Sequence, residues 1–178
     1  GLSTPERESI ESACSSAKYT QGPGAYNSCL SSQLQARNRQ GGTPDVSHLT
    51  APERESIESA CSSAKYTRGP AAYNACLTSQ LASLSRQGGR PSLATLTSVE
   101  TESIESACSS AKYTQGPAAY NQCLSRQLAA LSALPRRANL SSLDPSIRTS
   151  VESACSTAKY TQGPAAYNTC LLRQLAQL

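Results

Sequence analysis

The chain of 178 residues contains no Phe, Trp or Met, is 38% hydrophobic, and carries a formal net charge of +4. This mild charge comes without an Arg- or Lys-rich run, so the sequence predicts no nucleic-acid partner. No apolar run approaches the roughly 20 residues of a membrane-spanning helix, so no transmembrane segment is expected.

A segment with two cysteines, SACSSAKYTQGPGAYNSCL at residues 12–30, returns three times with few changes. Each copy begins 47 residues after the copy before it, which indicates a repeat array rather than one or two ordinary domains. We expect hairpin repeats at 1–37, 48–84, 95–131 and 142–178, separated by connectors at 38–47, 85–94 and 132–141.

The first element expected in each repeat is a helix that starts at a capping residue. In the first repeat Ser3 precedes Glu6 by three residues, which is a capping box, and Pro5 suits the first turn. Ile10 and Cys14 then follow at the spacing of one buried helical stripe. The corresponding caps of the later repeats are Thr50, Thr97 and Asp144.

The tetrapeptide TQGP predicts the end of this helix and the start of a second one. Gly22 can adopt the positive φ of a helix terminus, and Pro23 suits the first position of the next helix. Tyr26, Cys29 and Leu30 lie on one stripe of that second helix. Each repeat is therefore expected to form a helical hairpin.

The two cysteines of each repeat lie level with each other in such a hairpin, so a bond between them is geometrically natural. An even set of eight cysteines without a Cys-x-x-Cys motif favours disulfides over free thiols or a metal site. Each bond closes a loop of about 15 residues and contributes about 3 kcal/mol. Disulfides predict an oxidising location, extracellular or periplasmic. The expected pairs are Cys14–Cys29, Cys61–Cys76, Cys108–Cys123 and Cys155–Cys170.

Charged and amide side chains near the open end of the hairpin have two interpretations. Glu6 and Arg37 meet at that end, where they either pair or, as we expect, stay solvated surface charges that contribute little. Gln33 lies near the apolar stripe of the second helix, so we expect its amide to bond to backbone across the same hairpin.

Four polar or aromatic residues of the first repeat, Lys18, Tyr19, Tyr26 and Asn27, recur in every repeat. They are either four equal sites for a glycan or peptide, or traces of recent duplication. Tyr19 is the exception, because a bulky ring on a Ser/Ala face indicates contact with a neighbouring repeat or chain. The interface tyrosines expected on this ground are Tyr19, Tyr66, Tyr113 and Tyr160.

No catalytic set is found in the sequence. The only histidine, His48, lies in a connector and has no counterpart in the other repeats. Oxidised thiols cannot serve as nucleophiles, and the triplet Asn139-Leu140-Ser141 matches a glycosylation sequon that also arises by chance. We therefore expect no enzymatic activity, no cofactor and no metal.

The connectors differ far more than the hairpins, and Gly41-Gly42 and Gly88-Gly89 predict bends or flexible links. Two arrangements follow, namely independent hairpins on a flexible string or a packed solenoid. A single hairpin is too small to bury a large core without neighbours. The fold class expected is all-α, a tandem array of four disulfide-stapled hairpins with solenoid-like packing.

The first and last repeats resemble the inner ones, whereas solenoids usually have polar terminal repeats. We expect contact between the two ends of different molecules through Leu2, Leu171, Leu172, Leu175 and Leu178. The function expected is that of a secreted structural repeat protein, a homo-oligomer that assembles head to tail into a filament or surface layer. The alternative is a cell-envelope binding module for glycan or peptide.

Overall fold

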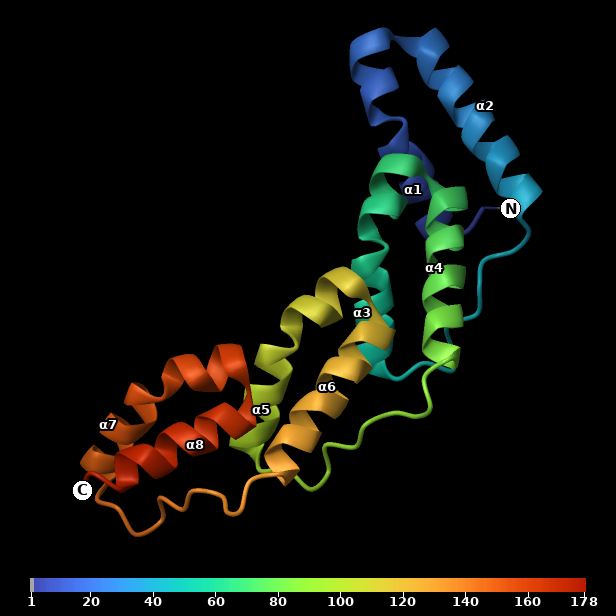
Figure 1. Ribbon diagram of the computed structural model, residues 1–178. Coiled ribbons are helices and arrows are strands. Elements are labelled where there is room, and N and C mark those ends of the chain that lie inside the picture. Colours follow the sequence, from blue (N-terminus) through green and yellow to red (C-terminus); the bar gives the residue numbers. More distant parts are fainter. Residues whose placement is uncertain (1) are drawn as a thin grey trace. The chain divides into compact units, whose positions relative to one another are not determined.

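The computed structural model describes residues 2–178, and every regular element in this range is helical. Each repeat has two α-helices joined by a π-helical turn, and in Figure 1 the two α-helices of each repeat run antiparallel. We number the hairpins 1 to 4 in chain order. Their elements are α1 (Thr4–Ala13), η1 (Ala17–Gln21) and α2 (Pro23–Gln40); α3 (Ala51–Ala60), η2 (Ala64–Arg68) and α4 (Pro70–Ser85); α5 (Ser98–Ala107), η3 (Ala111–Gln115) and α6 (Pro117–Ser132); and α7 (Pro145–Ala154), η4 (Ala158–Gln162) and α8 (Pro164–Leu175).

The chain forms two compact units. Unit 1 comprises residues 2–88 and Tyr113–Ala118, so it holds hairpins 1 and 2 and part of the turn of hairpin 3. Unit 2 comprises Gly89–Lys112 and Ala119–Leu178, and holds the rest of hairpin 3 together with hairpin 4. The predicted all-α class, with four disulfide-stapled helical hairpins, is confirmed.

The first helix of each hairpin begins at the capping residue that the sequence predicts. At α1 the Glu6 amide donates to Ser3 Oγ at 3.4 Å, and the Ser3 amide donates to Glu6 Oε2 at 2.9 Å. The same reciprocal capping box starts α3 and α5. At α7 the cap is Asp144, whose Oδ1 accepts from the Ser146 amide at 2.8 Å. These caps fix the start of each hairpin by satisfying amides that a helix leaves unpaired.

The first α-helix ends earlier than the sequence predicts, at Ala13 in hairpin 1 and not at the TQGP segment. The following cysteine caps the helix, and the chain continues as a π-helical turn, in which the Gly163 amide donates to the carbonyl of Ala158, five residues earlier, at 3.1 Å. Gly22 follows η1 with φ 87° and ψ 179°, a conformation essentially restricted to glycine. Pro23 then begins α2, as expected.

The cores are small, and a disulfide lies inside each of them. All eight cysteines are bonded as the sequence predicts, and each pair has a Cα–Cα distance of 5.8 Å. In hairpin 2, Ile57 and Cys61 of α3 are buried against Leu77 of α4. Because so few apolar side chains are buried, each staple supplies a large part of the stability of its hairpin.

The connectors are packed turns rather than featureless links. The Leu49 amide donates to the Val46 carbonyl at 3.2 Å, and the Leu96 amide donates to the Leu93 carbonyl at 3.0 Å. Leu49 is buried in the core of hairpin 2, and Leu93 and Leu96 pack against the core of hairpin 3. The connectors therefore share two apolar positions three residues apart, although the rest of their sequence differs.

Ion pairs close the open ends of two hairpins. Arg37 Nε donates to Glu6 Oε1 at 2.9 Å, and Arg137 Nη1 donates to Glu100 Oε2 at 3.1 Å. Hydrogen bonds from the Ser3 backbone and from Arg37 hold the pKa of Glu6 below its ordinary value of 4.5. The expectation that these charges stay solvated is thus wrong for Glu6, which is buried.

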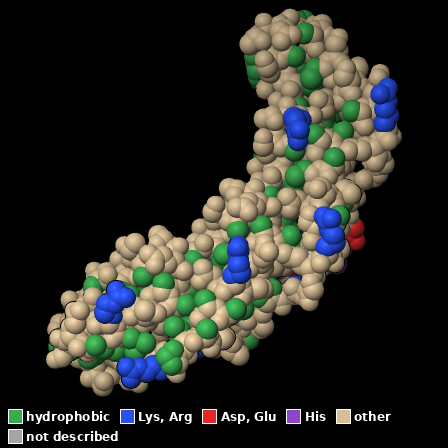
Figure 2. Space-filling view, viewed as in Figure 1, with side chains coloured by type: hydrophobic (Ala, Val, Ile, Leu, Met, Phe, Trp, Pro, Cys, Tyr) green, Lys and Arg blue, Asp and Glu red, His purple; other side chains and the backbone are tan. Residues whose placement is uncertain are grey.

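The basic side chains visible on one face of the molecule are dispersed. On the face shown in Figure 2, the Lys and Arg side chains stand apart from one another instead of forming a patch. Within residues 2–178, none of the helices is both long enough and apolar enough to cross a bilayer.

Candidate functional site: the face between successive hairpins

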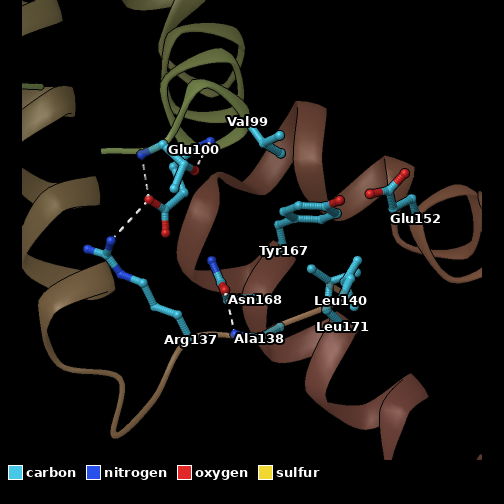
Figure 3. A pocket seen from close by; sticks show the side chains of 10 residues that line it. Val99, Glu100, Arg137, Ala138, Leu140, Glu152, Tyr167, Asn168 and Leu171 are labelled. Atoms are coloured by element: carbon cyan, nitrogen blue, oxygen red, sulfur yellow. Dashed lines mark hydrogen bonds and ion pairs between the residues drawn. The ribbon is translucent and has the colours of Figure 1, made fainter. Parts of the chain in front are cut away.

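A pocket of about 250 Å³ in unit 2 is lined by apolar and polar side chains. Figure 3 shows its apolar side chains, with Tyr167 and Leu171 coming from α8 and Leu140 from the connector. Of its two carboxylates, Glu100 is paired with Arg137, and Glu152 lines the side near Tyr167. Burial raises the pKa of Tyr167, so its phenol stays neutral near pH 7.

Metal binding finds no support in the described part of the chain. Among residues 2–178, His, Cys, Asp and Glu side chains nowhere gather in a group of three or more that could hold an ion. His48 is an exposed connector residue.

The feature that recurs is the contact between one hairpin and the turn of the next. Within unit 1, α1 packs against η2 and α4, and α2 packs against α4. Within unit 2, α5 packs against η4 and α8. We call the contributing surface of the earlier hairpin the donor face; in hairpin 1 it consists of Ser9, Ser12 and Gln33. The acceptor face is the surface of the following turn, which in hairpin 2 consists of Lys65, Tyr66, Gly69 and Pro70.

Serine hydroxyls on the donor face bond to turn carbonyls on the acceptor face. Ser9 Oγ donates to the Lys65 carbonyl at 2.5 Å, and Ser12 Oγ donates to the Tyr66 carbonyl at 2.9 Å. Such bonds contribute about 0.5–1.5 kcal/mol each, and the small side chains let the helix approach the turn closely. The same bonds recur for Ser103 and Lys159 at 2.6 Å, Ser106 and Tyr160 at 2.9 Å, and, inside unit 1, Ser59 and Tyr113 at 3.0 Å.

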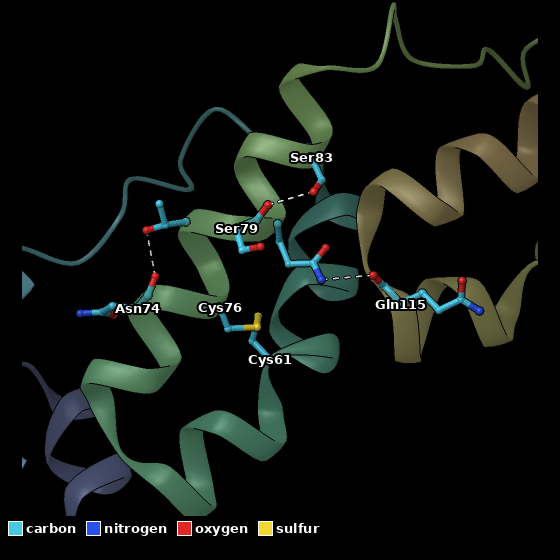
Figure 4. The surroundings of a disulfide bond; sticks show 8 residues. Cys61, Asn74, Cys76, Ser79, Ser83 and Gln115 are labelled. Atoms are coloured by element: carbon cyan, nitrogen blue, oxygen red, sulfur yellow. Dashed lines mark hydrogen bonds between the residues drawn. A yellow bond between two sulfur atoms is a disulfide. The ribbon is translucent and has the colours of Figure 1, made fainter.

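A glutamine of the donor face lies over the glycine that ends the next turn. Gln80 Nε2 donates to the Gln115 carbonyl at 3.2 Å. Figure 4 shows a hydrogen bond that ends at Gln115, in the surroundings of the Cys61–Cys76 disulfide. A Cβ atom on Gly116 would lie 2.0 Å from Gln80 Oε1, so a side chain there would displace the glutamine amide. The expectation that these glutamines bond across their own hairpin is therefore wrong, because they reach the next one. The other two contacts are Gln33 over Gly69 and Gln127 over Gly163.

A glutamate at the rim completes the contact. Lys159 Nζ donates to Glu102 Oε2 at 2.6 Å, which lowers the pKa of Glu102 and raises the pKa of Lys159. In unit 1, Lys65 Nζ lies 3.9 Å from Glu8 Oε2. The third glutamate, Glu55, accepts from Tyr113 Oη at 3.2 Å, so all three glutamates at this position contact the following turn.

The predicted interface tyrosines lie on the acceptor face, and their exposure reports whether that face is covered. Tyr66, Tyr113 and Tyr160 are 47%, 43% and 44% exposed, whereas Tyr19 is 77% exposed. Pro23 is likewise exposed, although the equivalent prolines of the other three hairpins are buried. The acceptor face of hairpin 1 is therefore open.

The donor face of hairpin 4 is open as well. Ser153 is exposed, whereas its equivalents in the first three hairpins are partly buried. Ser150 is also exposed, and its equivalents Ser9, Ser56 and Ser103 are 0% exposed. Gln174 occupies the position of the three interface glutamines and is partly buried.

The predicted interface leucines have less uniform positions. Leu171 is buried in the core of hairpin 4 with Val151, Cys155 and Tyr167, so it offers no free surface. Leu178 is 71% exposed. The remaining three, Leu2, Leu172 and Leu175, are partly buried.

The repeated Lys, Tyr and Asn residues do not form an open ligand surface in hairpins 2 to 4. Asn74, Asn121 and Asn168 are only 4%, 6% and 5% exposed. Lys65 Nζ lies 5.0 Å from the centroid of the Tyr66 ring, so these two groups contact each other. What stays exposed for a glycan or peptide is therefore only part of the predicted surface.

Sequence reasoning missed the serine that lies deepest in the contact, represented by Ser9, and the rim glutamate represented by Glu8. The signal for both was a polar side chain repeated at the same position beside the apolar stripe in three or more repeats. In an isolated hairpin these positions would face solvent, because only the turn of the next hairpin covers them. No family model, no curated protein and no solved structure matches this chain.

Proposed function

We propose that the chain is a non-enzymatic structural repeat protein that assembles head to tail into a filament or surface layer. The observation that carries this proposal is that hairpin 1 has an open acceptor face and hairpin 4 has an open donor face. Disulfide-stapled hairpins are typical of proteins in an oxidising compartment, and we place the assembly outside the cytoplasm, in an extracellular or periplasmic location.

The occupant proposed for both faces is a second copy of this chain. The same pair of faces already meets between hairpins inside each unit, with serine hydroxyls on turn carbonyls and glutamine over glycine. A contact between two different patches of one molecule does not close on itself in a dimer. It continues as a ring or an open filament.

The contact between molecules differs from the internal ones in having no connector. A covalent link raises the effective concentration of its two ends to about the millimolar range, which a second molecule does not share. Self-association is therefore expected to depend on protein concentration and to form a ladder of sizes.

A blocking variant tests the donor face. Ser153→Arg places a long charged side chain on it, and we expect this variant to remain monomeric where the wild-type chain forms oligomers. Thr169→Arg is the matched control, because position 169 and its three equivalents are exposed in every hairpin and Thr169 Oγ1 donates to the Ala165 carbonyl of its own helix. Sedimentation velocity over a range of concentrations gives the readout. A wild-type chain that stays monomeric up to millimolar concentration would refute the proposal.

A mixing experiment tests polarity. Gly24→Arg blocks the acceptor face: Gly24 is exposed with nothing within 4 Å of an added Cβ, whereas its equivalents in hairpins 2 to 4 are partly buried. Each blocked variant keeps one working face, namely the donor face in Gly24→Arg and the acceptor face in Ser153→Arg. An equimolar mixture is expected to give one-to-one dimers and nothing longer, while each variant alone stays monomeric. Dimers of one variant alone would contradict head-to-tail contact.

A further inference from the structure

We infer that Gln174 of one molecule lies over Gly22 of the next, and that residue 149 sets the strength of this contact. The inference rests on the proposed head-to-tail assembly. It gives that contact a register, in which Gln174 and Gly22 are the recognition pair. It also identifies residue 149 as the position that makes this contact weaker than the contacts inside the chain.

The register follows from the glutamine and glycine positions. In the three internal contacts a glutamine side chain occupies the space where a Cβ of the glycine would lie, at 1.9–2.1 Å from Oε1. Gly22 has φ 87°, close to 91–98° at the other three turns, and the space around it is empty. Gln174 holds the corresponding position in hairpin 4. Only this register puts a glutamine over the one turn glycine that is not covered.

The serine positions are consistent with the same register. Ser150 and Ser153 hold the positions of Ser9 and Ser12, whose hydroxyls donate to the carbonyls of a lysine and a tyrosine in the following turn. Hairpin 1 offers the equivalent carbonyls at Lys18 and Tyr19.

The rim glutamate is the one element that hairpin 4 lacks. Glu8, Glu55 and Glu102 each contact the following turn, at 3.9, 3.2 and 2.6 Å. The equivalent residue of hairpin 4 is Thr149, whose Oγ1 donates to the Pro145 carbonyl of its own helix at 2.9 Å. In the contact between molecules, Lys18 therefore faces a neutral side chain where the internal lysines Lys65 and Lys159 face a carboxylate.

The consequence is that the contact between molecules is the weakest in an assembly. The missing ion pair lies at a solvent-exposed rim, where such pairs change affinity about two- to fivefold and lose their effect in high salt. Putting the glutamate back is therefore expected to strengthen the assembly without altering its register.

The experiment introduces an ion pair between residue 149 of one molecule and residue 18 of the next, and then exchanges the two charges. Thr149→Glu is expected to lower the dissociation constant for self-association about two- to fivefold at low salt, with the gain lost in concentrated salt. Adding Lys18→Glu to this variant places two carboxylates together and should remove the gain. The charge-reversed double variant Thr149→Lys with Lys18→Glu should recover it. Thr149→Gln serves as the uncharged control and should behave as the wild type.

The outcomes separate this inference from the proposed function. If the wild-type chain does not self-associate, the proposed function fails. If it does, but Thr149→Glu leaves the dissociation constant unchanged or Lys18→Glu leaves the gain intact, the register proposed here is wrong while head-to-tail assembly stands. Circular dichroism spectra that match the wild type show that each variant is folded, since residues 18 and 149 lie on the surface of their own hairpins.

Discussion

The turns of hairpin 1 and hairpin 4 have nearly the same sequence, AKYTQGPGAYN and AKYTQGPAAYN, yet they differ in what covers them. Around η4, the hydroxyls of α5 reach the turn carbonyls, Pro164 is buried, and Gln127 lies over Gly163. Around η1, Lys18, Tyr19 and Pro23 are exposed, and no described side chain lies over Gly22. The local sequence thus determines the shape of the turn, while a neighbouring hairpin determines whether the same atoms are buried contacts or a free binding surface.

Removing one disulfide should produce the largest difference in stability and amide protection between the turns of hairpins 1 and 4. Cys14→Ala with Cys29→Ala, and Cys155→Ala with Cys170→Ala, are each expected to cost about 3 kcal/mol of the free energy of unfolding of their hairpin. Hydrogen exchange should then distinguish the two. The amides of η4 keep protection because α5 still covers them, whereas those of η1 exchange freely.

The disulfide comparison has a clear contrary result. Equal loss of protection at η1 and η4 would mean that the covering hairpin contributes nothing to the turn beneath it. Circular dichroism melts of the two double variants, run beside the reduced wild-type chain, give the matching stability scale.

Glycine substitutions should give a smaller difference between the same two turns. Gly22→Ala forces alanine into a backbone conformation that costs about 1–3 kcal/mol. Gly163→Ala has the same strain and also displaces Gln127, whose bond to the Gln162 carbonyl is then lost, so it should cost about 1 kcal/mol more. Urea unfolding measures both.

The glycine comparison has an internal control. Adding Gln127→Ala removes the side chain that collides with the new methyl group, so only the backbone strain and the missing glutamine bond remain. The cost of the added Gln127→Ala on the Gly163→Ala background should be close to zero. A full additional loss of unfolding free energy would show that the two residues act independently, and would contradict an energetic coupling between Gln127 and Gly163.

The pH dependence of stability should be the smallest effect. The lowered pKa values of Glu6 and Glu102 mean that their contributions are present above the ordinary value of 4.5 and are lost as pH falls below it. The raised pKa of Lys159 means that its contribution is present below the ordinary value of 10.5 and is lost as pH rises through the raised value. Melting temperatures across both ranges test this, and Glu6→Gln should flatten the acid limb.

Residues that act within one hairpin could be predicted from the sequence. Ser3 and Glu6 indicate the helix start, Gly22 and Pro23 indicate the turn, and the 15-residue spacing indicates the disulfide. These features can be predicted because the residues that form each of them lie near one another along the chain. The packing of the apolar connector residues Val46 and Leu49 was not predicted, because glycines and polar residues surround them in the sequence.

Residues that act between hairpins could not be predicted in the same way. Ser9 looks like one polar residue among several on α1, and only the following turn supplies the Lys65 carbonyl that makes it a buried donor. The direction of Gln33 depends on Gly69, 36 positions further along the chain. Such contacts have no short-range sequence signature, since the partner atoms belong to the backbone and carry no residue type.

The near identity of the repeated faces has a consequence for folding order. The donor and acceptor faces repeat with few changes along the chain, so a hairpin that folds early has several similar faces to which it could bind. The connector between α2 and α3, residues 41–50, reaches at most about 35 Å when extended, which keeps the adjacent hairpin nearest. Connector length therefore selects the correct neighbour by proximity, and a longer connector should allow hairpins of two chains to exchange places during refolding.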